Sequence, residues 1–311
     1  TKQCKTIISN NNPTLDVRDK SAGFIGLITV SLFVTSAVSS FHNKCEMVQM
    51  FSLKTIGSVE HELTTPDCAV FYTPVYRLIF SLYANHLASQ QIDRLIEAKD
   101  RASVQSCAFN TKNIVLIIGE SLGRHHSQQY GYFMKTTPRQ IALEKAGNLI
   151  PFTDVVAPWN LTSFVFKNIF SMHVVGQKGE WCDYPLFPQL FRKAGYHVSF
   201  ITNQFLPQAK EAVYDFSGGF FLNNKELSKS MFDTRNTRLH TYDEGLLADY
   251  DNKLKAENRE YNLIIFHLIG CHVSYNRRYP ADRKHFKASD YKQKQKQRQG
   301  PRKRMEPQDK R

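Results

Sequence analysis

This sequence of 311 residues lacks two patterns that would identify a class of protein directly, internal repeats and nucleic-acid recognition motifs. The lack of internal repeats excludes the repeat architectures. The formal net charge is +13, but residues 292–311 alone hold nine Lys or Arg and two Asp or Glu, a balance of +7. Because the basic excess is concentrated in this tail and no motif accompanies it, the sequence predicts no nucleic-acid partner.

Long uncharged runs are also scarce, and one of them stands out. Ala22 to Phe41 reads AGFIGLITVSLFVTSAVSSF, 20 residues without a charge, which is enough to cross a bilayer as a helix. A secretory signal peptide is the alternative, but the run is long for one and a polar segment of about 20 residues precedes it. Four Lys or Arg come before the run and one just after it, which favours a cytoplasmic segment 1–21 and places the rest of the chain across the membrane.

Cysteine is sparse, with six residues in the chain. Beyond the membrane run, Cys45, Cys68, Cys107 and Cys182 would face an oxidising compartment and could form disulfides. Cys45 and Cys68 are a plausible pair, but the sequence does not fix the connectivity, and free thiols are the alternative. Cys4 would stay reduced on the cytoplasmic side.

Residues 42–110 form the expected connector between the membrane run and a globular part. Pro74 precedes residues 75–101, whose apolar side chains recur at helical spacing, and proline suits the first turn of a helix. The sequence therefore predicts an amphipathic helix here. The helix could lie along the membrane surface or pack against the globular domain, and the sequence leaves both open.

From residue 111 the pattern changes to alternating strands and helices. The aliphatic run Ile114–Ile118, closed by Gly119, predicts a strand buried on both faces, as in parallel sheets. The other expected elements are a helix at Leu186–Lys193 ending at Gly195, a strand at His197–Ile201, a helix at Arg238–Glu257 and a strand at Leu263–His267. This alternation predicts an α/β fold with a doubly wound, mostly parallel sheet over residues 111–290, followed by a disordered basic tail at 291–311.

Polar side chains follow the expected strands at the points where each strand ends. Glu120 follows the first strand, Thr202–Gln204 follow the second, and His267 with His272 lie at the third. The carboxyl ends of parallel strands share one edge of a sheet, where ligands bind, so these side chains are expected to meet there. Taken alone, Glu120 either caps the next helix or binds a metal ion.

Two hydroxyl groups begin another helical run. Thr162 and Ser163 directly precede the apolar residues 164–172. A hydroxyl at a helix N-terminus commonly caps the helix. The same position also suits a nucleophile that attacks phosphorus, because the free N–H groups and the helix dipole favour a phosphoryl anion.

Five segments occur in an order and spacing typical of one family: IVLIIGESLGRHHSQQYGY, TDVVAPWNLTSFVFKNIFS, FRKAGYHVSFITNQ, YDEGLL and HLIGCHVSYNRRYP. Together they resemble the bacterial phosphoethanolamine transferases of the sulfatase/alkaline-phosphatase-like superfamily. The resemblance covers residues 22–290 and implies a periplasmic alkaline-phosphatase-like domain anchored in the inner membrane. It further implies transfer of phosphoethanolamine from phosphatidylethanolamine to lipid A, a lipopolysaccharide-core sugar or a periplasmic glucan, by a chain expected to be monomeric.

The resemblance also implies roles for single residues. Glu120 matches the family's strand-end zinc ligand. Thr162 matches the nucleophile, which touches the same Zn²⁺ and carries phosphoethanolamine between two half-reactions. His267 and His272 match histidines that line the phosphoethanolamine pocket or a second metal, and Asn203 is expected to bind substrate at the same edge. A free threonine is a poor nucleophile, and coordination to zinc would favour its alkoxide.

The sequence departs from the family in two respects. A late Ser-Asp-His-Gly-Glu-like segment, which completes the zinc site in the family, is missing, so two zinc donors are expected here. One membrane helix replaces several, and the first residue is Thr1 rather than methionine. We therefore expect a fragment incomplete at both ends and inactive by itself, with a frame change near Asp290 as the source of the basic tail. A genuinely shortened protein whose tail has another role is the alternative.

Two other functions stay open on the sequence. A non-catalytic, membrane-anchored protein could use the pocket to bind a phospholipid headgroup. A phosphoglycerol transferase or another hydrolase of the superfamily would share the threonine and the metal. A sulfatase proper is disfavoured, because it needs Cys or Ser within a C/S-x-P-x-R signature and none surrounds Thr162.

Overall fold

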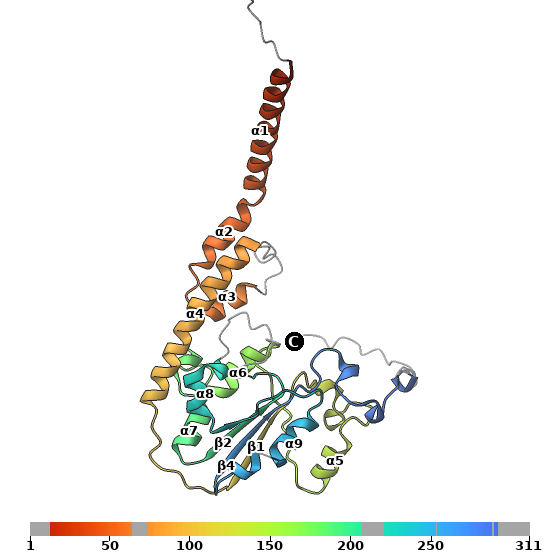
Figure 1. The fold of residues 1–311 in the computed structure, drawn as a ribbon. Helices are drawn as coiled ribbons and strands as arrows, with labels where there is room; N and C mark the ends of the chain where they lie inside the picture. Colours follow the sequence, from red (N-terminus) through yellow and green to blue (C-terminus); the bar gives the residue numbers. More distant parts are fainter. Residues whose placement is uncertain (1–12, 64–73, 207–220, 253, 288, 292–311) are drawn as a thin grey trace, which may run out of the picture. The chain divides into compact units, whose positions relative to one another are not determined.

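The computed structural model describes residues 13–63, 74–206, 221–252, 254–287 and 289–291 (Figure 1). The chain forms two compact units, Thr1–Ala88 and Ser89–Arg311, and each is described here by itself. The structure does not describe Cys4, Cys68 or most of the predicted tail at 291–311. The expected Cys45–Cys68 disulfide therefore has one partner outside the described residues. Those predictions therefore stay predictions.

The first unit contains the apolar helix that the sequence predicts. Helix α1 spans Pro13–Ser39, and its segment Ser21–Ser39 is long and apolar enough to cross a membrane, with a mean hydropathy of 1.9. Its large apolar side chains are exposed, as in Leu27 (67%) and Phe33 (74%). An all-round apolar surface of this length suits a lipid surrounding better than water, so the helix fits a membrane anchor.

Three further helices begin in the first unit: α2 at Phe41–Met50, α3 at Ile56–Leu63 and α4 at Pro74–Arg101. They share a small core of buried side chains: Met50, Ile56, Val59, Phe80, Ala84 and Leu87. The hydroxyl of Tyr83 donates a hydrogen bond to the carbonyl of Leu53 at 2.7 Å. Helix α4 thus begins at Pro74, as predicted, and its apolar face makes this core.

The second unit is built on a four-stranded parallel sheet in the order β1-β4-β2-β3 (Figure 1). The strands are β1 Asn113–Ile118, β2 His197–Thr202, β3 Thr234–Arg235 and β4 Asn262–His267. Ile118 and Thr202 both pair with His267, so the carboxyl ends of three strands lie in one row. The predicted α/β fold with a parallel sheet is confirmed.

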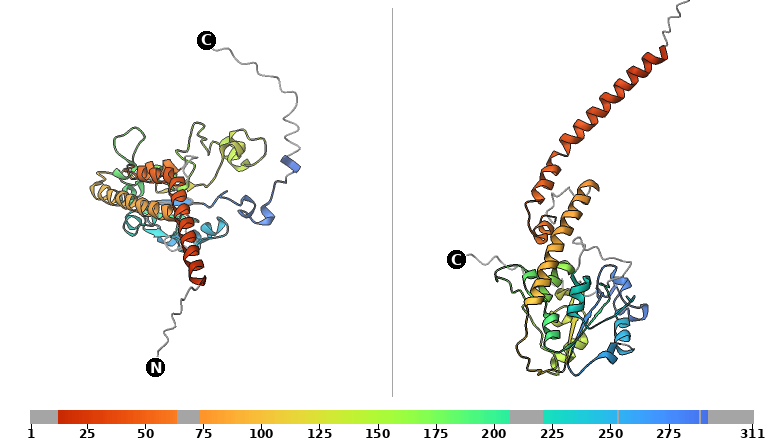
Figure 2. Two further views of the ribbon diagram at one scale, coloured as in Figure 1. Left: turned by 90° about the horizontal axis from the view of Figure 1, so that it is seen from above. Right: turned by 60° about the vertical axis from the view of Figure 1, so that its left-hand side comes forward.

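Both faces of the sheet carry an apolar core. On one face, Val198, Phe200, Leu263 and Ile265 pack with side chains from α4, α6, α7 and α8. On the other, Ile201, Ile264 and Phe266 pack with Leu246 of α9 and with Leu254. The helices are α5 Pro138–Lys145, α6 Thr162–Phe170, α7 Phe187–Lys193, α8 Lys225–Met231 and α9 Glu244–Asn252. Helices on both faces make the sheet doubly wound (Figures 1 and 2).

The remaining regular elements are single turns of 3₁₀-helix: Arg124–His126, Gln128–Tyr130, Trp181–Asp183, Phe221–Asn223, Leu254–Glu257, Tyr275–Arg277 and Ala281–Arg283. The end of α4 belongs to this unit, where Leu95 is fully buried in the core. Of the two surroundings left open for the connector helix, the structure therefore places its last turns against the globular domain.

The prediction that β1 is buried on both faces is wrong. Val115 is 54% exposed and Ile117 is 63% exposed, whereas Ile114, Leu116 and Ile118 pack partly buried against the core. The reason is position: β1 is an edge strand of the described sheet, paired only with β4, and no described layer covers the outer face of these two side chains. A run of aliphatic residues is compatible with burial of both faces of a strand, but it does not show that other elements cover both faces.

The predicted helix Arg238–Glu257 is also wrong in its bounds. Helix α9 begins only at Glu244 and ends at Asn252. The preceding residues are held by the end of β2 instead: the Asn236 side chain bonds both N–H and C=O of Thr202, and the backbone N–H of His240 donates to Asn203 Oδ1 at 2.7 Å. These side-chain bonds replace the helical ones, which explains the late start.

Candidate active site

Glu120 lies at the carboxyl edge of the sheet, two residues after β1. Its side chain is half-buried, and both of its oxygens accept hydrogen bonds. Oε2 accepts from Thr162 Oγ1 at 2.7 Å, and Oε1 accepts from Ser121 Oγ at 2.9 Å. The structure thus brings together the two residues for which the sequence predicts chemistry, although 42 positions separate them.

Thr162 is the first residue of α6, and its hydroxyl does not cap the helix. The N-cap is Leu161, in extended conformation, and no side-chain capping bond forms there. The Thr162 hydroxyl instead donates to Glu120, from the N-terminal residue of α6. The capping use of this hydroxyl is therefore wrong for α6, and its use as a nucleophile stays a prediction.

Gln204 links Glu120 to the buried interior of the sheet. Its Nε2 donates to the carbonyl of Leu268 at 2.7 Å, and lies 3.2 Å from His267 Nε2 and 3.4 Å from Glu120 Oε2. The sequence placed Gln204 at the strand end but gave it no role. Its position at the end of the predicted strand, next to Asn203, could have marked it as a site residue. The sequence could not show which groups its side-chain amide would contact.

His267 is fully buried at the end of β4. Its Nε2 lies 3.2 Å from the Gln204 amide nitrogen and its Nδ1 lies 3.0 Å from Thr202 Oγ1, so both ring nitrogens have a polar neighbour. Burial lowers the pKa of His267 to about 4, against weaker raising effects of Glu120 and Asp243. At neutral pH His267 is an uncharged member of this network, and it reaches the site through Gln204.

The low pKa of His267 makes the second unit sensitive to acid. Because the folded pKa (about 4) lies below the unfolded value (6.5), its contribution is fully present above pH 6.5 and is lost as pH falls toward 4. The shift corresponds to about 3 kcal/mol of unfolding free energy. We expect urea unfolding, followed by the fluorescence of Trp159 and Trp181, to show this loss in the wild type and a flatter pH dependence in His267→Gln.

The control for this experiment is His285→Gln, which changes an exposed histidine. It should keep the wild-type pH dependence. Parallel curves for His267→Gln and the wild type between pH 6.5 and 4 would contradict the assignment of the acid sensitivity to His267.

The other two predicted site residues differ in what they offer a substrate. Asn203 is 3% exposed, and both ends of its amide are engaged, Nδ2 with Asp243 Oδ1 at 3.0 Å and Oδ1 with the His240 N–H. His272 is half-buried and near enough to Glu120 to influence its charge. The substrate roles of Asn203, His267 and His272 stay predictions, and His272 has the most accessible side chain of the three.

Glu120 carries a negative charge at neutral pH. Burial by itself would raise its pKa, but the hydrogen bonds from Thr162, Ser121 and Gln204, together with the nearby His272, lower it overall. An ionised carboxylate accepts the Thr162 hydroxyl proton in a charge-assisted hydrogen bond. The pair can therefore orient the threonine oxygen and take up its proton.

The zinc site implied by the resemblance is incomplete in the described residues. Zinc in proteins takes four ligands, or three with an open position. Glu120 and Thr162 supply two oxygen donors, and the part of the chain that the structure describes holds no cluster of three or more His, Cys, Asp or Glu able to bind a metal ion. These residues do not by themselves fit a zinc ion.

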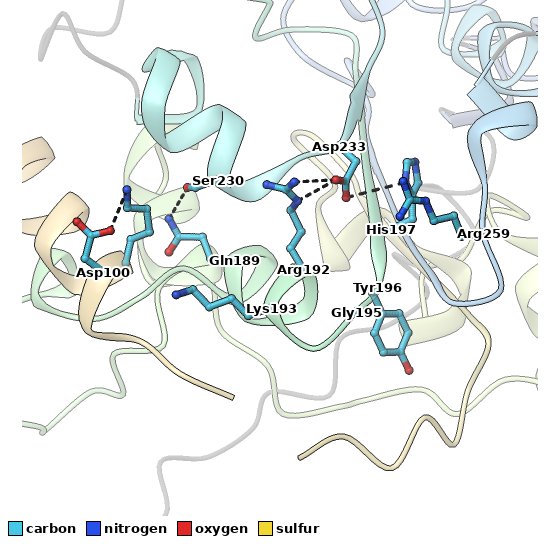
Figure 3. A pocket seen from close by; sticks show the side chains of 11 residues that line it. Asp100, Gln189, Arg192, Lys193, Gly195, Tyr196, His197, Ser230, Asp233 and Arg259 are labelled. Atoms are coloured by element: carbon cyan, nitrogen blue, oxygen red, sulfur yellow. Dashed lines mark hydrogen bonds and ion pairs between the residues drawn. The ribbon is translucent and has the colours of Figure 1, made fainter. Parts of the chain in front are cut away.

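A cavity of about 470 Å³ lies at the opposite edge of the sheet, where β2 and β4 begin (Figure 3). Two of its basic side chains pair with acids of the same lining, Arg192 with Asp233 at 2.8 Å and Lys99 with Asp100 at 3.1 Å, and Lys193 and Arg259 also line it. Ligands of open α/β sheets bind at the carboxyl ends of the strands. We therefore place the candidate active site at Glu120 and Thr162.

Comparison with known proteins identifies the family of the chain. The sulfatase family model matches residues 112–306, more than half of the chain, and spans both Glu120 and Thr162. Phosphoethanolamine transferase EptC of Escherichia coli O18:K1:H7 is 30% identical over 176 residues, 56% of this chain and 30% of that protein. Phosphoethanolamine transferase CptA of Salmonella typhimurium is 26% identical over 217 residues, 68% of this chain and 37% of that protein.

A solved structure, the C-terminal periplasmic domain of EptC from Escherichia coli, is 29% identical with a TM-score of 0.45, covering 55% of this chain and 46% of that one. The chain spans about a third of the length of the curated relatives that it matches. The family model covers the whole sheet and the Glu120–Thr162 pair, and these relatives carry one activity in their names. The chain therefore belongs to the sulfatase family.

Proposed function

We propose that the protein is a membrane-anchored phosphoethanolamine transferase in which Thr162 accepts the phosphoethanolamine group. The donor is phosphatidylethanolamine, and the acceptor is a hydroxyl or phosphate oxygen of lipid A or of the lipopolysaccharide core. The anchor is the apolar segment of α1, in the inner membrane, with the second unit in the periplasm. The observation that carries this proposal is the 2.7 Å hydrogen bond from Thr162 Oγ1 to Glu120 Oε2.

The first half-reaction transfers the group to the enzyme. Thr162 Oγ1 attacks the phosphorus of the donor, its proton passes to Glu120, and the bond between phosphorus and the diacylglycerol oxygen breaks. The diacylglycerol oxygen takes up a proton from water as it leaves, while Glu120 keeps the proton of Thr162. The N-terminal N–H groups of α6 face the phosphoryl oxygens, where charge accumulates, and stabilise the transition state by electrostatics.

The second half-reaction returns the enzyme to its first state. An acceptor oxygen attacks the phosphorus of phosphothreonine and loses its proton to water, and the bond from phosphorus to Thr162 Oγ1 breaks. The threonine oxygen regains a proton from Glu120. This ping-pong course needs only one site, which is used twice.

Zinc has a limited place in this proposal. Glu120 and Thr162 are oxygen donors of kinds that zinc accepts, and a bound ion would lower the pKa of the hydroxyl. A zinc ion at this pair requires further donors from outside the described residues. Measurement of the metal content of the purified chain tests this part separately from the transfer itself.

The test is a search for the covalent intermediate. The full chain is purified in detergent and incubated with phosphatidylethanolamine, and its peptides are analysed by mass spectrometry. From this proposal we expect a gain of one phosphoethanolamine group on Thr162 and none on the adjacent Ser163. This result would overturn the expectation from the sequence that the chain is inactive by itself. Added lipid A should discharge the group.

Each alternative function has its own outcome in this experiment. A mass gain on Thr162 with phosphatidylglycerol in place of phosphatidylethanolamine would identify a phosphoglycerol transferase. Binding of phosphatidylethanolamine without any covalent product would contradict the proposal and identify a headgroup-binding protein.

A further inference from the structure

The segment YDEGLL is part of the family resemblance, yet the proposed reaction gives it no task. Its Asp243 directly precedes α9 and is half-buried. The carboxylate accepts three hydrogen bonds: Oδ1 from the N–H of Ile269 at 2.9 Å and from Asn203 Nδ2 at 3.0 Å, and Oδ2 from the N–H of Gly270 at 2.9 Å. One side chain thus joins the start of α9 to the loop after β4 and to the end of β2.

The loop after β4 lies directly against the backbone of Glu120. The N–H of Cys271 donates to the carbonyl of Glu120 at 3.0 Å. Gly270 has a φ of +50°, and a Cβ added there would lie 2.7 Å from the Glu120 carbonyl oxygen and 2.9 Å from its nitrogen. Residue 270 must therefore be glycine for the loop to approach this closely, and the loop determines where the Glu120 backbone sits.

The hydrogen bond that Asp243 accepts from Asn203 affects the position of the Glu120 carboxylate. Asp243 fixes the amide of Asn203, the residue before Gln204, and the Gln204 amide contacts both Leu268 and the Glu120 carboxylate. Asp243 thus holds Glu120 from two directions: its backbone through Gly270, and its carboxylate through the Asn203–Gln204 pair.

We infer that Asp243 is a positioning residue for the Glu120–Thr162 pair. Its three accepted bonds all come from the protein chain, so it acts on the reaction through the placement of Glu120 rather than by contact with substrate. The inference deepens the proposed function, on which its kinetic consequence rests. Its structural consequence, a loop held against Glu120, can be measured independently of any activity.

The test uses Asp243→Asn in the full chain in detergent. Asparagine has nearly the same shape, but its NH₂ group would face the N–H of Gly270, and two donors repel. We expect the loop to loosen. Iodoacetamide should then alkylate the exposed Cys271 several-fold faster, while the alkylation rates of Cys107 and the buried Cys182 stay as in the wild type.

The kinetic readout is the rate at which Thr162 gains phosphoethanolamine. We expect the maximum rate to fall by on the order of tenfold to a hundredfold, because misplacement of a catalytic group by about 1 Å has effects of this size. The half-saturating donor concentration should stay unchanged, which separates positioning from substrate binding. Asp251→Asn, at an exposed position of the same helix, is the matched control and should change neither readout.

A second variant covers the case in which Asp243→Asn fails to fold. Gly270→Ala pushes the same loop away from Glu120 and should give the same two changes, faster alkylation of Cys271 and slower labelling of Thr162. Wild-type behaviour of Gly270→Ala or of folded Asp243→Asn in the Cys271 experiment overturns the inference. Faster Cys271 alkylation in a chain whose wild type never gains phosphoethanolamine supports the inference and overturns the proposed function instead.

Discussion

Replacing Thr162 by alanine should abolish the covalent phosphoethanolamine label, whereas Thr162→Ser should retain it. Alanine removes the oxygen that attacks phosphorus, and no described hydroxyl other than those of Thr162 and Ser121 bonds to the Glu120 carboxylate. Serine keeps an oxygen on the same carbon and loses only a methyl group. The measurement is the amount of labelled peptide after incubation with phosphatidylethanolamine.

Two companion variants separate the roles in this pair. Glu120→Gln keeps an acceptor for the Thr162 hydroxyl but no longer takes its proton, so we expect the labelling rate to fall by roughly 10²–10⁴-fold, the usual size of a general-base contribution. Ser163→Ala is the matched control, one residue along the same helix, and should label like the wild type. A label that persists in Thr162→Ala would place the nucleophile elsewhere.

Phe200→Ala should cause the largest loss of stability among single core substitutions in β2. Phe200 is fully buried, its ring stacks on Phe232 with centroids 4.7 Å apart, and it meets Phe170 edge to face at 6.1 Å. Removal of a buried aromatic ring loses its transfer free energy and leaves a cavity, so we expect the unfolding free energy to fall by about 3–5 kcal/mol. Urea unfolding, followed by the fluorescence of Trp159 and Trp181, measures this loss.

Phe152→Ala provides the contrast for this experiment. Phe152 belongs to the same unit and has the same side chain, but it is 72% exposed. We expect its replacement to change the unfolding free energy by no more than about 0.5 kcal/mol. Equal effects of the two substitutions would show that the sheet core formed around β2 does not stabilise the second unit.

The strands and the polar residues at their ends were predictable because both are local properties. Strands β1, β2 and β4 are short apolar runs ended by polar residues, and Glu120 and Thr162 each follow a recognisable start or stop signal. A run of residues does not show which other strands and helices will pack beside it in the fold. The exposed Val115 and Ile117 illustrate this, because the same aliphatic pattern fits a central strand and the edge strand that β1 proves to be.

The late start of α9 has the same cause on a smaller scale. Residues 238–243 suit a helix by their pattern, but Asn203 and Asp243 hold them and the neighbouring loop at the end of the sheet. A hydrogen bond between side chains or loops far apart in the chain outweighs a weak local preference for helix. The resulting geometry, rather than the helix itself, is what places the loop against Glu120.

By itself the sequence determined the apolar membrane segment, the α/β alternation, the family and the two oxygens of the candidate site. Only the tertiary structure decided that these oxygens lie 2.7 Å apart, that Gln204 ties Glu120 to a buried neutral histidine, and that Asp243 fixes the loop behind it. The physical reason is that the spacing of apolar residues, the charge pattern and the residue types determine structure only over a few neighbouring residues. Distances between strand ends depend on how the whole sheet packs, which no local pattern contains.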